Sequence, residues 1–196
     1  MPEGDAVRRL AGTLDELFVG GIVSASSPQG RFASSAALLD GWVMQRVRVH
    51  GKHMFIGFVP PIEGETYEAG VALLEGAAAG SGEPILPEDA PWPDRWVHIH
   101  LGLYGWWRFN GDETVVDEGH GVAHRIPNVP KGEWNGHSET RWGEGFGEAK
   151  AGEWEPPEPV GAVRLRMFND HAVADLVGPN RCDLITDEER VKAESK

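Results

Sequence analysis

The stretch WVMQRVRVHGKHMFIGFV, residues 42–59, holds two candidate strands separated by a very short polar turn. In the first candidate strand, every second residue lies on the same face, namely Val43, Gln45, Val47 and Val49. This period-two spacing is typical of a β-strand. The second, residues 53–59, is apolar almost throughout. Because only His50–Gly51–Lys52 lies between them, the stretch predicts a β-hairpin.

Further short strand-like segments lie on both sides of this hairpin. They are Gly21–Ser26, Trp96–Leu101 with Tyr104–Phe109 as a further pair, and Val163–Phe168 with Ala172–Leu176, joined by a turn at Asn169–Asp170–His171. Before them, residues 4–18 predict an amphipathic helix, whose apolar positions are Val7, Leu10, Ala11, Leu14, Leu17 and Phe18. Gly20–Gly21 predicts its end. We therefore expect a mainly β protein with helices (α+β), a β-sandwich or barrel with an N-terminal helix.

The composition limits the class of protein. The 196 residues are enough for one domain, with 40% hydrophobic residues, and the single Cys182 excludes an intramolecular disulfide and a four-cysteine zinc site. No apolar run approaches the roughly 20 residues that span a membrane. We therefore expect a cytoplasmic protein without membrane contact.

The charge is strongly acidic, with 18 basic and 31 acidic side chains and a net charge of −13. Such a charge argues against a generic nucleic-acid binder, which needs cations to displace counterions from phosphate. The acids are concentrated in residues 60–94 and 128–160, two segments rich in Gly or Pro that we expect to be long surface loops. A short strand is possible at residues 71–75.

The chain begins MPEGDAVRRL, and removal of Met1 would leave Pro2 as a free secondary amine next to the Glu3 carboxylate. The alternative is an ordinary helix start, because Pro and acidic residues are both common in the first turn. A secondary amine that attacks a sugar aldehyde forms an iminium, an electron sink that drives β-elimination. Glu3 could then transfer protons as a general acid or base.

Three other groups could carry chemistry. Lys52 in the tight turn can hold a phosphate, or it is a solvated turn lysine. Leu103 and Tyr104 occupy a turn beside Gly102, where they either insert into a partner or fold back into the core. His98 and His100 share one strand face and could bind a metal, although a third ligand is not evident.

Together, MPEGDAVRR at the start, HGKHMF at 50–55 and HLGLYGWWR at 100–108 resemble the formamidopyrimidine-DNA glycosylase and endonuclease VIII family. The string from Leu103 to Arg108 favours the endonuclease VIII branch, whose substrates are mainly oxidised pyrimidines. The resemblance continues through residues 161–176, skips the two acidic loops and fades after about residue 186. It implies the family's N-terminal domain, a β-sandwich flanked by helices.

The resemblance implies a role for each matching residue. Pro2 matches the nucleophile that displaces the damaged base and forms a Schiff base. Glu3 matches the acid/base that acts on the deoxyribose. Lys52 matches a catalytic lysine that contacts DNA phosphate. Leu103 and Tyr104 match two residues of the wedge that fills the gap left by an everted nucleotide.

The sequence also departs from the family pattern. Gly102 stands at the first wedge position, where endonuclease VIII commonly has a larger polar residue, and this puts recognition of the opposite base in doubt. We expect residues 1–186 to be the catalytic N-terminal domain, with acidic expansions at about 60–94 and 128–160. Residues 187–196 would be an exposed helical stub before an absent helix–two-turn–helix domain. No cofactor is expected in this chain, because the family's zinc finger belongs to the C-terminal part.

The resemblance thus implies a DNA glycosylase/AP lyase of base excision repair, with damaged or abasic DNA as its partner. Its activity in residues 1–196 alone is expected to be impaired, because the basic second domain of the family grips the phosphates around the lesion. Two alternatives from other classes remain. One is a non-enzymatic domain that binds protein partners through its acidic loops, and the other is a metal-binding β-barrel that uses His98 and His100.

Overall fold

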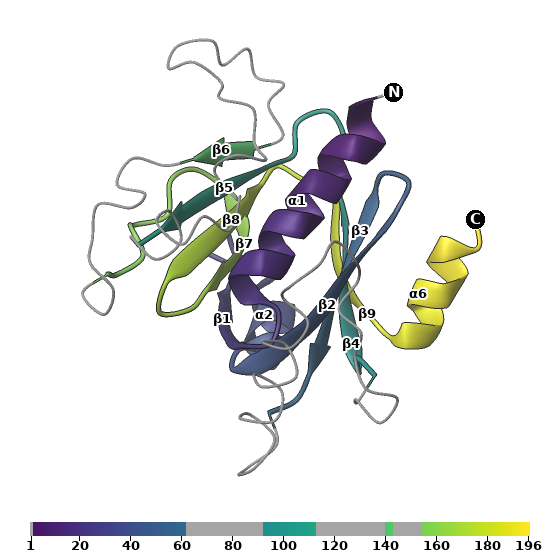
Figure 1. Ribbon diagram of the computed structural model, residues 1–196, viewed down its shortest axis with the longest axis horizontal. Helices are drawn as coiled ribbons and strands as arrows, with labels where there is room; N and C mark the ends of the chain where they lie inside the picture. Colours follow the sequence, from purple (N-terminus) through teal and green to yellow (C-terminus); the bar gives the residue numbers. More distant parts are fainter. Residues whose placement is uncertain (1, 62–91, 113–139, 143–153) are drawn as a thin grey trace.

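The computed structural model describes residues 2–61, 92–112, 140–142 and 154–196 (Figure 1). Helices and strands follow one another along the chain in this order: α1 (Pro2–Phe18), β1 (Ile22–Ser26), α2 (Ala33–Leu39), β2 (Trp42–His50), β3 (His53–Val59), β4 (Arg95–His100), β5 (Trp106–Gly111), β6 (Thr140–Trp142), β7 (Val163–Phe168), β8 (Ala172–Val177), β9 (Arg181–Ile185) and α6 (Asp187–Glu194). The prediction of a mainly β fold with an N-terminal helix is confirmed.

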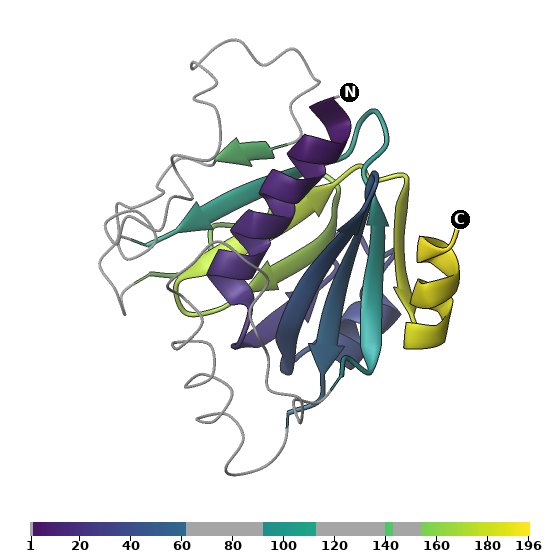
Figure 2. The ribbon, with the colours of Figure 1, turned by 45° about the vertical axis from the view of Figure 1, so that its right-hand side comes forward.

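The strands form one hydrogen-bonded series in the order β6-β5-β8-β7-β1-β2-β3-β4-β9. Strand β1 joins its two halves, because Ile22 and Val23 pair with β2 while residues 24–26 pair with β7. Figures 1 and 2 show the two halves as separate sheets that diverge from β1, with α1 lying along them. Buried side chains from both halves and from α1 belong to a single apolar core.

Helix α1 is held by the apolar face that its sequence predicts. Val7, Leu10, Leu14 and Phe18 are buried in the core, and the helix packs against β2 and β3. Burying each such side chain contributes roughly 1.5–3 kcal/mol. The helix ends as predicted, since Gly20 takes a φ of 93° and its N–H donates to the carbonyl of Met44 at 2.8 Å. The buried apolar face and the hydrogen bond of Gly20 together fix α1 on the sheet. They therefore also fix where its N-terminal end lies.

The predicted β2–β3 and β7–β8 hairpins are both present. In the second, the side-chain oxygen of Asn169 accepts hydrogen bonds from the backbone N–H groups of His171 and Ala172, as a short polar turn requires. The side-chain amide of Asn169 also donates to the carbonyl of Leu17 at 2.9 Å. This hairpin turn therefore lies at the C-terminal end of α1.

The expectation that the strands near 96–101 and 104–109 form a pair is wrong. Strand β4 pairs with β3 and β9, whereas β5 pairs with β6 and β8 in the other half of the series. The intervening residues 101–105 look like a hairpin turn in the sequence, but they carry the chain from one half to the other. This crossing leaves their tip exposed at the end of both sheets.

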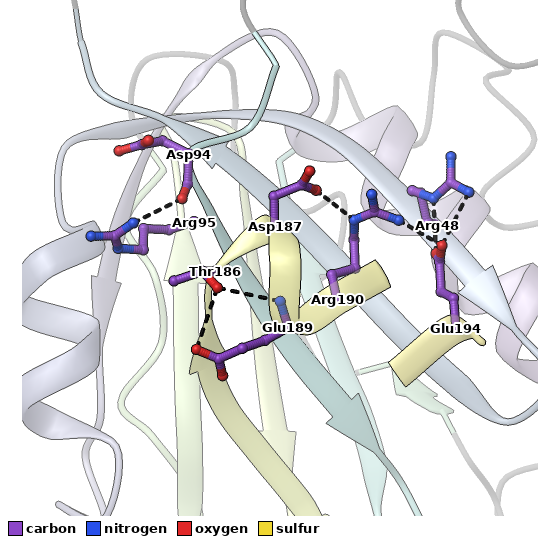
Figure 3. Close-up of polar contacts among 8 residues, drawn as sticks. All are labelled: Arg48, Asp94, Arg95, Thr186, Asp187, Glu189, Arg190 and Glu194. Carbon is purple, nitrogen blue, oxygen red and sulfur yellow. Dashed lines mark hydrogen bonds and ion pairs between the residues drawn. The ribbon is translucent and has the colours of Figure 1, made fainter. Parts of the chain in front are cut away.

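Three regular elements in the described chain were not predicted, namely α2, β6 and β9. Strand β6 lies within the predicted loop 128–160, most of which falls outside the described residues together with most of 60–94 and the expected strand at 71–75. The helix expected at residues 187–196 is present as α6, but it is not an exposed stub, because it packs against β4 beside β9 (Figures 2 and 3). Among the described residues, no helix combines the length and apolar character needed to cross a membrane.

Candidate active site

Three chain segments meet at one end of the molecule. Figures 1 and 2 show the start of α1, the β2–β3 turn and the β4–β5 connection grouped at the end marked by the N-terminus. A Cβ atom built on Gly4 would lie 3.9 Å from the carbonyl oxygen of Gly51, so the first turn of α1 abuts the β2–β3 turn. The fold therefore brings together the three segments to which the sequence assigns chemistry.

Lys52 occupies a two-residue turn that the neighbouring strands define tightly. The last pair of the β2–β3 ladder is His50 with His53, which leaves only Gly51 and Lys52 to reverse the chain. Gly51 has a φ of 57°, in the left-handed region that glycine tolerates without cost. Lys52 is exposed at the tip of this turn, so its ammonium group can reach a ligand that lies over the start of α1.

Leu103 and Tyr104 do not fold back into the core. They are 75% and 73% exposed, respectively, at the tip of the 101–105 connection. The alternative in which these side chains pack inward is therefore wrong. Two large, neighbouring exposed side chains at a turn tip are suited to insertion into a partner.

The structure gives a reason for the glycine at position 102. Its φ of 67° disfavours any side chain, and a Cβ atom there would lie 2.5 Å from the Cγ atom of Asn180. Asn180 belongs to the β8–β9 turn. The turn at residues 101–105 and the β8–β9 turn thus approach each other so closely that position 102 has no room for the larger side chain of the family pattern.

His98 and His100 do share a strand face, but His98 has another partner. Its Nε2 atom lies 2.9 Å from Nδ1 of His53, a hydrogen bond between two imidazole rings. No group of three or more His, Cys, Asp or Glu side chains that could hold a metal ion occurs in the described part of the chain. The metal-binding alternative therefore gains no support from these residues.

Burial governs the protonation of these two rings. The pKa of His98 is lowered to about 4, first by desolvation of the buried ring and then by the electrostatic influence of His53 and Arg181, while Asp183 opposes the shift. The pKa of His53 is lowered as well, first by burial and then by His100, Arg181 and His50. The His98 ring is therefore neutral at pH 7.

Of the predicted site residues, Lys52, Leu103 and Tyr104 have described side chains, and all three are exposed at the same end of the molecule. The side chains of Pro2 and Glu3 lie outside the described set, although the backbone of α1 begins at Pro2. The hydrogen bond between His53 and His98 was not predicted from the sequence. The pairing of β3 with β4 would have revealed it, since the register sets His98 opposite Phe55, two residues beyond His53 on the same face.

Comparisons with known proteins identify relatives of the chain. No protein-family model matches the chain. The chain is 31% identical over 189 residues to Endonuclease 8 1 of Mycobacterium bovis and of Mycobacterium tuberculosis. The matched region covers 96% of this chain and 44% of each relative, so the chain spans less than half of their length.

A solved structure shares the fold. It is a complex between a mutant of the protein LlFPG and a DNA that contains THF, with a TM-score of 0.50 at 12% sequence identity. The similarity covers 98% of this chain and 46% of that protein. At this identity the likeness concerns the fold alone. From its sequence similarity to the two endonucleases and from this shared fold, the chain belongs to the formamidopyrimidine-DNA glycosylase and endonuclease VIII family and corresponds to its N-terminal domain.

Proposed function

We propose that the chain is the catalytic domain of an endonuclease VIII-like DNA glycosylase/AP lyase that acts in the cytoplasm on damaged or abasic DNA, mainly at oxidised pyrimidines. The proposal rests above all on the contact between the first turn of α1 and the Gly51–Lys52 turn. This contact brings the first turn of α1 next to the turn that carries Lys52, which supports a site shared by the N-terminus of the chain and Lys52. The name shared by the two mycobacterial relatives supports the same activity.

The chemistry begins with the amine of Pro2 after removal of Met1. The positive end of α1 disfavours a further positive charge there, which keeps part of the amine neutral and nucleophilic. Attack on the C1′ aldehyde of an abasic sugar forms an iminium and releases water. The iminium makes the neighbouring C2′–H acidic, so that loss of this proton breaks the C3′–O bond and releases the 3′ phosphate.

Each remaining residue has a role in this scheme. Glu3 transfers protons to and from the sugar. Lys52 binds the phosphate next to the abasic sugar and holds C1′ near the amine. Leu103 and Tyr104, exposed at the same end, fill the gap in a duplex from which the nucleotide has been extruded. No metal or cofactor takes part in these steps.

Borohydride trapping tests the proposal. The chain is incubated with a single-stranded oligonucleotide that carries one abasic site, and borohydride reduces any iminium to a stable amine. We expect a covalent protein–DNA adduct whose yield falls at least tenfold in Pro2→Gly and in Lys52→Ala. Lys192→Ala is the matched control, because Lys192 is an exposed lysine on α6 and belongs to none of the three segments that form the site.

Removal of Met1 is verified by mass spectrometry before each assay. A chain that retains Met1 should give far less adduct, because the nitrogen of Pro2 is then part of an amide and the free amine is one residue away. Full adduct yield in a chain with a blocked N-terminus would show that a lysine is the nucleophile. No adduct with the processed chain would instead favour the non-enzymatic alternative.

A further inference from the structure

Aromatic and imidazole rings form a continuous layer behind the turn that carries Lys52. His53 lies across the β3–β4 ladder from His100, and Phe55 lies across from His98. The ring centroids of His53 and His98 are 5.1 Å apart, and those of His53 and His100 are 4.8 Å apart. Phe55 stacks on His98 at 4.5 Å with an interplanar angle of 21°. All four side chains therefore share one face of the sheet.

The hydrogen bond between His53 and His98 locks this layer. The 2.9 Å separation of Nδ1 of His53 and Nε2 of His98 requires one ring to donate its N–H to the lone pair of the other. His98 cannot easily reorient, because it is buried with only 3% of its surface exposed and is stacked on Phe55. The buried ring thus serves as a fixed anchor for the half-buried His53.

His53 is the first residue of β3 and follows Lys52 directly. The hydrogen bond from His53 to His98 therefore ties the end of the β2–β3 hairpin to β4, a restraint that the β2–β3 ladder does not provide. The restrained turn is the one that abuts the first turn of α1 at Gly4. A displacement of about 1 Å in a catalytic group can cost a factor of 10² in rate.

We propose that His53 and His98 are positioning residues for Lys52, and that their ring-to-ring hydrogen bond holds the Gly51–Lys52 turn against the start of α1. The expected effect of this hydrogen bond on catalysis rests on the proposed function. Its structural part, an ordered turn, can be measured without substrate.

The pair depends on protonation in a defined way. Each neutral ring has one donor and one acceptor nitrogen. If one ring is protonated, the other still offers an acceptor, but if both are protonated no acceptor is left and the bond is lost. The charged or titratable groups that face the pair from the neighbouring strands and from α6 are His50, Arg48, His100, Arg181, Asp183 and Glu194. Because burial lowers the pKa of His98, this ring keeps its acceptor nitrogen at neutral pH, and we expect the bond to be present there.

The test compares two substitutions of His98. In His98→Gln the side-chain amide can take the place of Nε2 and keep a hydrogen bond to His53, whereas His98→Leu cannot. We expect the rate of borohydride trapping to fall at least tenfold in His98→Leu and to recover to within threefold of the original in His98→Gln. His171→Gln is the control, because it also removes a hydrogen-bonded imidazole but lies near the C-terminal end of α1. A 17-residue helix separates the two ends by about 25 Å.

The same substitutions are then made in the Lys52→Ala background. If His98 acts through Lys52, His98→Leu should change the trapping rate less than twofold there. An equal loss in both backgrounds would overturn the proposal, because the histidine would then act on the fold as a whole. Failure of His98→Gln to restore the rate while its thermal unfolding matches the original would overturn it too.

Backbone relaxation measured by NMR separates this proposal from the proposed function. The amides of Gly51 and Lys52 should become more mobile in His98→Leu and remain ordered in His98→Gln. If the original chain gives no DNA adduct, the proposed function fails, and this measurement still decides the positioning role. If His98→Leu does not fold, His53→Phe replaces it, and an unchanged turn in that variant would overturn the proposal.

Discussion

The guanidinium group of Arg190 lies over the indole ring of Trp96, with its central carbon 4.8 Å from the ring centroid. The same group donates from Nε to Asp187 at 2.7 Å and from Nη1 to Glu194 at 2.5 Å (Figure 3). Glu194 also accepts from Arg48 of β2 at 3.0 Å. Arg190 is the buried residue of α6, whereas its apolar Val191 is 51% exposed. Helix α6 is therefore attached to the sheet by charge and cation–π contacts.

Removing the arginine should release the helix. In Arg190→Ala we expect α6 to lose about 1–2 kcal/mol of docking free energy, since the cation–π contacts with Trp96 and Trp92 disappear. The ion pairs of Arg190 with Asp187 and Glu194 lie within α6 and orient the guanidinium group over these rings. Hydrogen exchange of the peptide covering residues 187–196 measures this loss as faster exchange. Lys192→Ala, which removes only an exposed pair with Glu188 at 3.7 Å, should leave the exchange rate nearly unchanged. Equal exchange rates in Arg190→Ala and the original would show that the contacts do not hold α6.

The docking of α6 should weaken in acid. Burial by itself would raise the pKa of Glu194, but its hydrogen bonds and charge contacts with Arg48 and Arg190 outweigh burial and lower it. A lowered folded-state pKa gives stability that is complete above the unfolded value of 4.5 and is lost as the pH falls through the folded value. Urea unfolding between pH 6 and pH 3 should show this loss, with a smaller slope in Glu194→Gln. Glu188→Gln, on the exposed side of the same helix, is the control and should keep the original slope.

Restoring a side chain at the first wedge position should be costly. In Gly102→Gln the positive φ costs about 1–2 kcal/mol, and the contact with Asn180 adds to it. Gly161→Ala shares a positive φ but has nothing within 4 Å of the added Cβ, so it isolates the backbone term. Urea unfolding of the two variants should rank Gly102→Gln as the more destabilised. Asn180→Gly should then recover part of the loss, and no recovery would mean that the close approach is not the cause.

The wedge residues should matter only where there is a gap to fill. On a single-stranded abasic oligonucleotide, Leu103→Ala and Tyr104→Ala should each change the lyase rate less than about twofold. Base excision from a duplex requires extrusion, which costs a few kcal/mol, and bending, which adds roughly 1–6 kcal/mol. For an acidic chain of net charge −13 we expect this excision to be near background. Robust excision of an oxidised pyrimidine from duplex DNA by residues 1–196 would contradict this expectation.

The parts of the fold that follow a simple periodicity were predictable from the sequence. Helix α1 and the β2–β3 hairpin have regular apolar spacing, and their positions in the structure agree with it to within two residues. Strand β9 and helix α2 are only five and seven residues long, too short for a periodic pattern to stand out. The crossing at residues 101–105 could not be distinguished from a hairpin turn, because the residues of a turn do not reveal whether the two strands that it connects pair with each other.

The exposed residues of the candidate site were predicted from the sequence, but the buried hydrogen bond behind them was not. Lys52, Leu103 and Tyr104 stood out because they occupy turns in recognisable motifs. The bond between His53 and His98 depends on the register of β3 against β4, which the sequence does not specify. The docking of α6 was missed for a similar reason, since DEERVKAE has no apolar face and Arg190 packs on Trp96 instead.

The central claim is that Pro2 is the nucleophile, and peptide mapping of the trapped adduct tests it most directly. The borohydride-reduced complex of the processed chain with single-stranded abasic DNA is digested with nuclease and trypsin, and the modified peptide is sequenced by mass spectrometry. The account predicts that the sugar remnant is attached to the N-terminal peptide PEGDAVR, at the nitrogen of Pro2. Attachment at Lys52 or at any other lysine would contradict it.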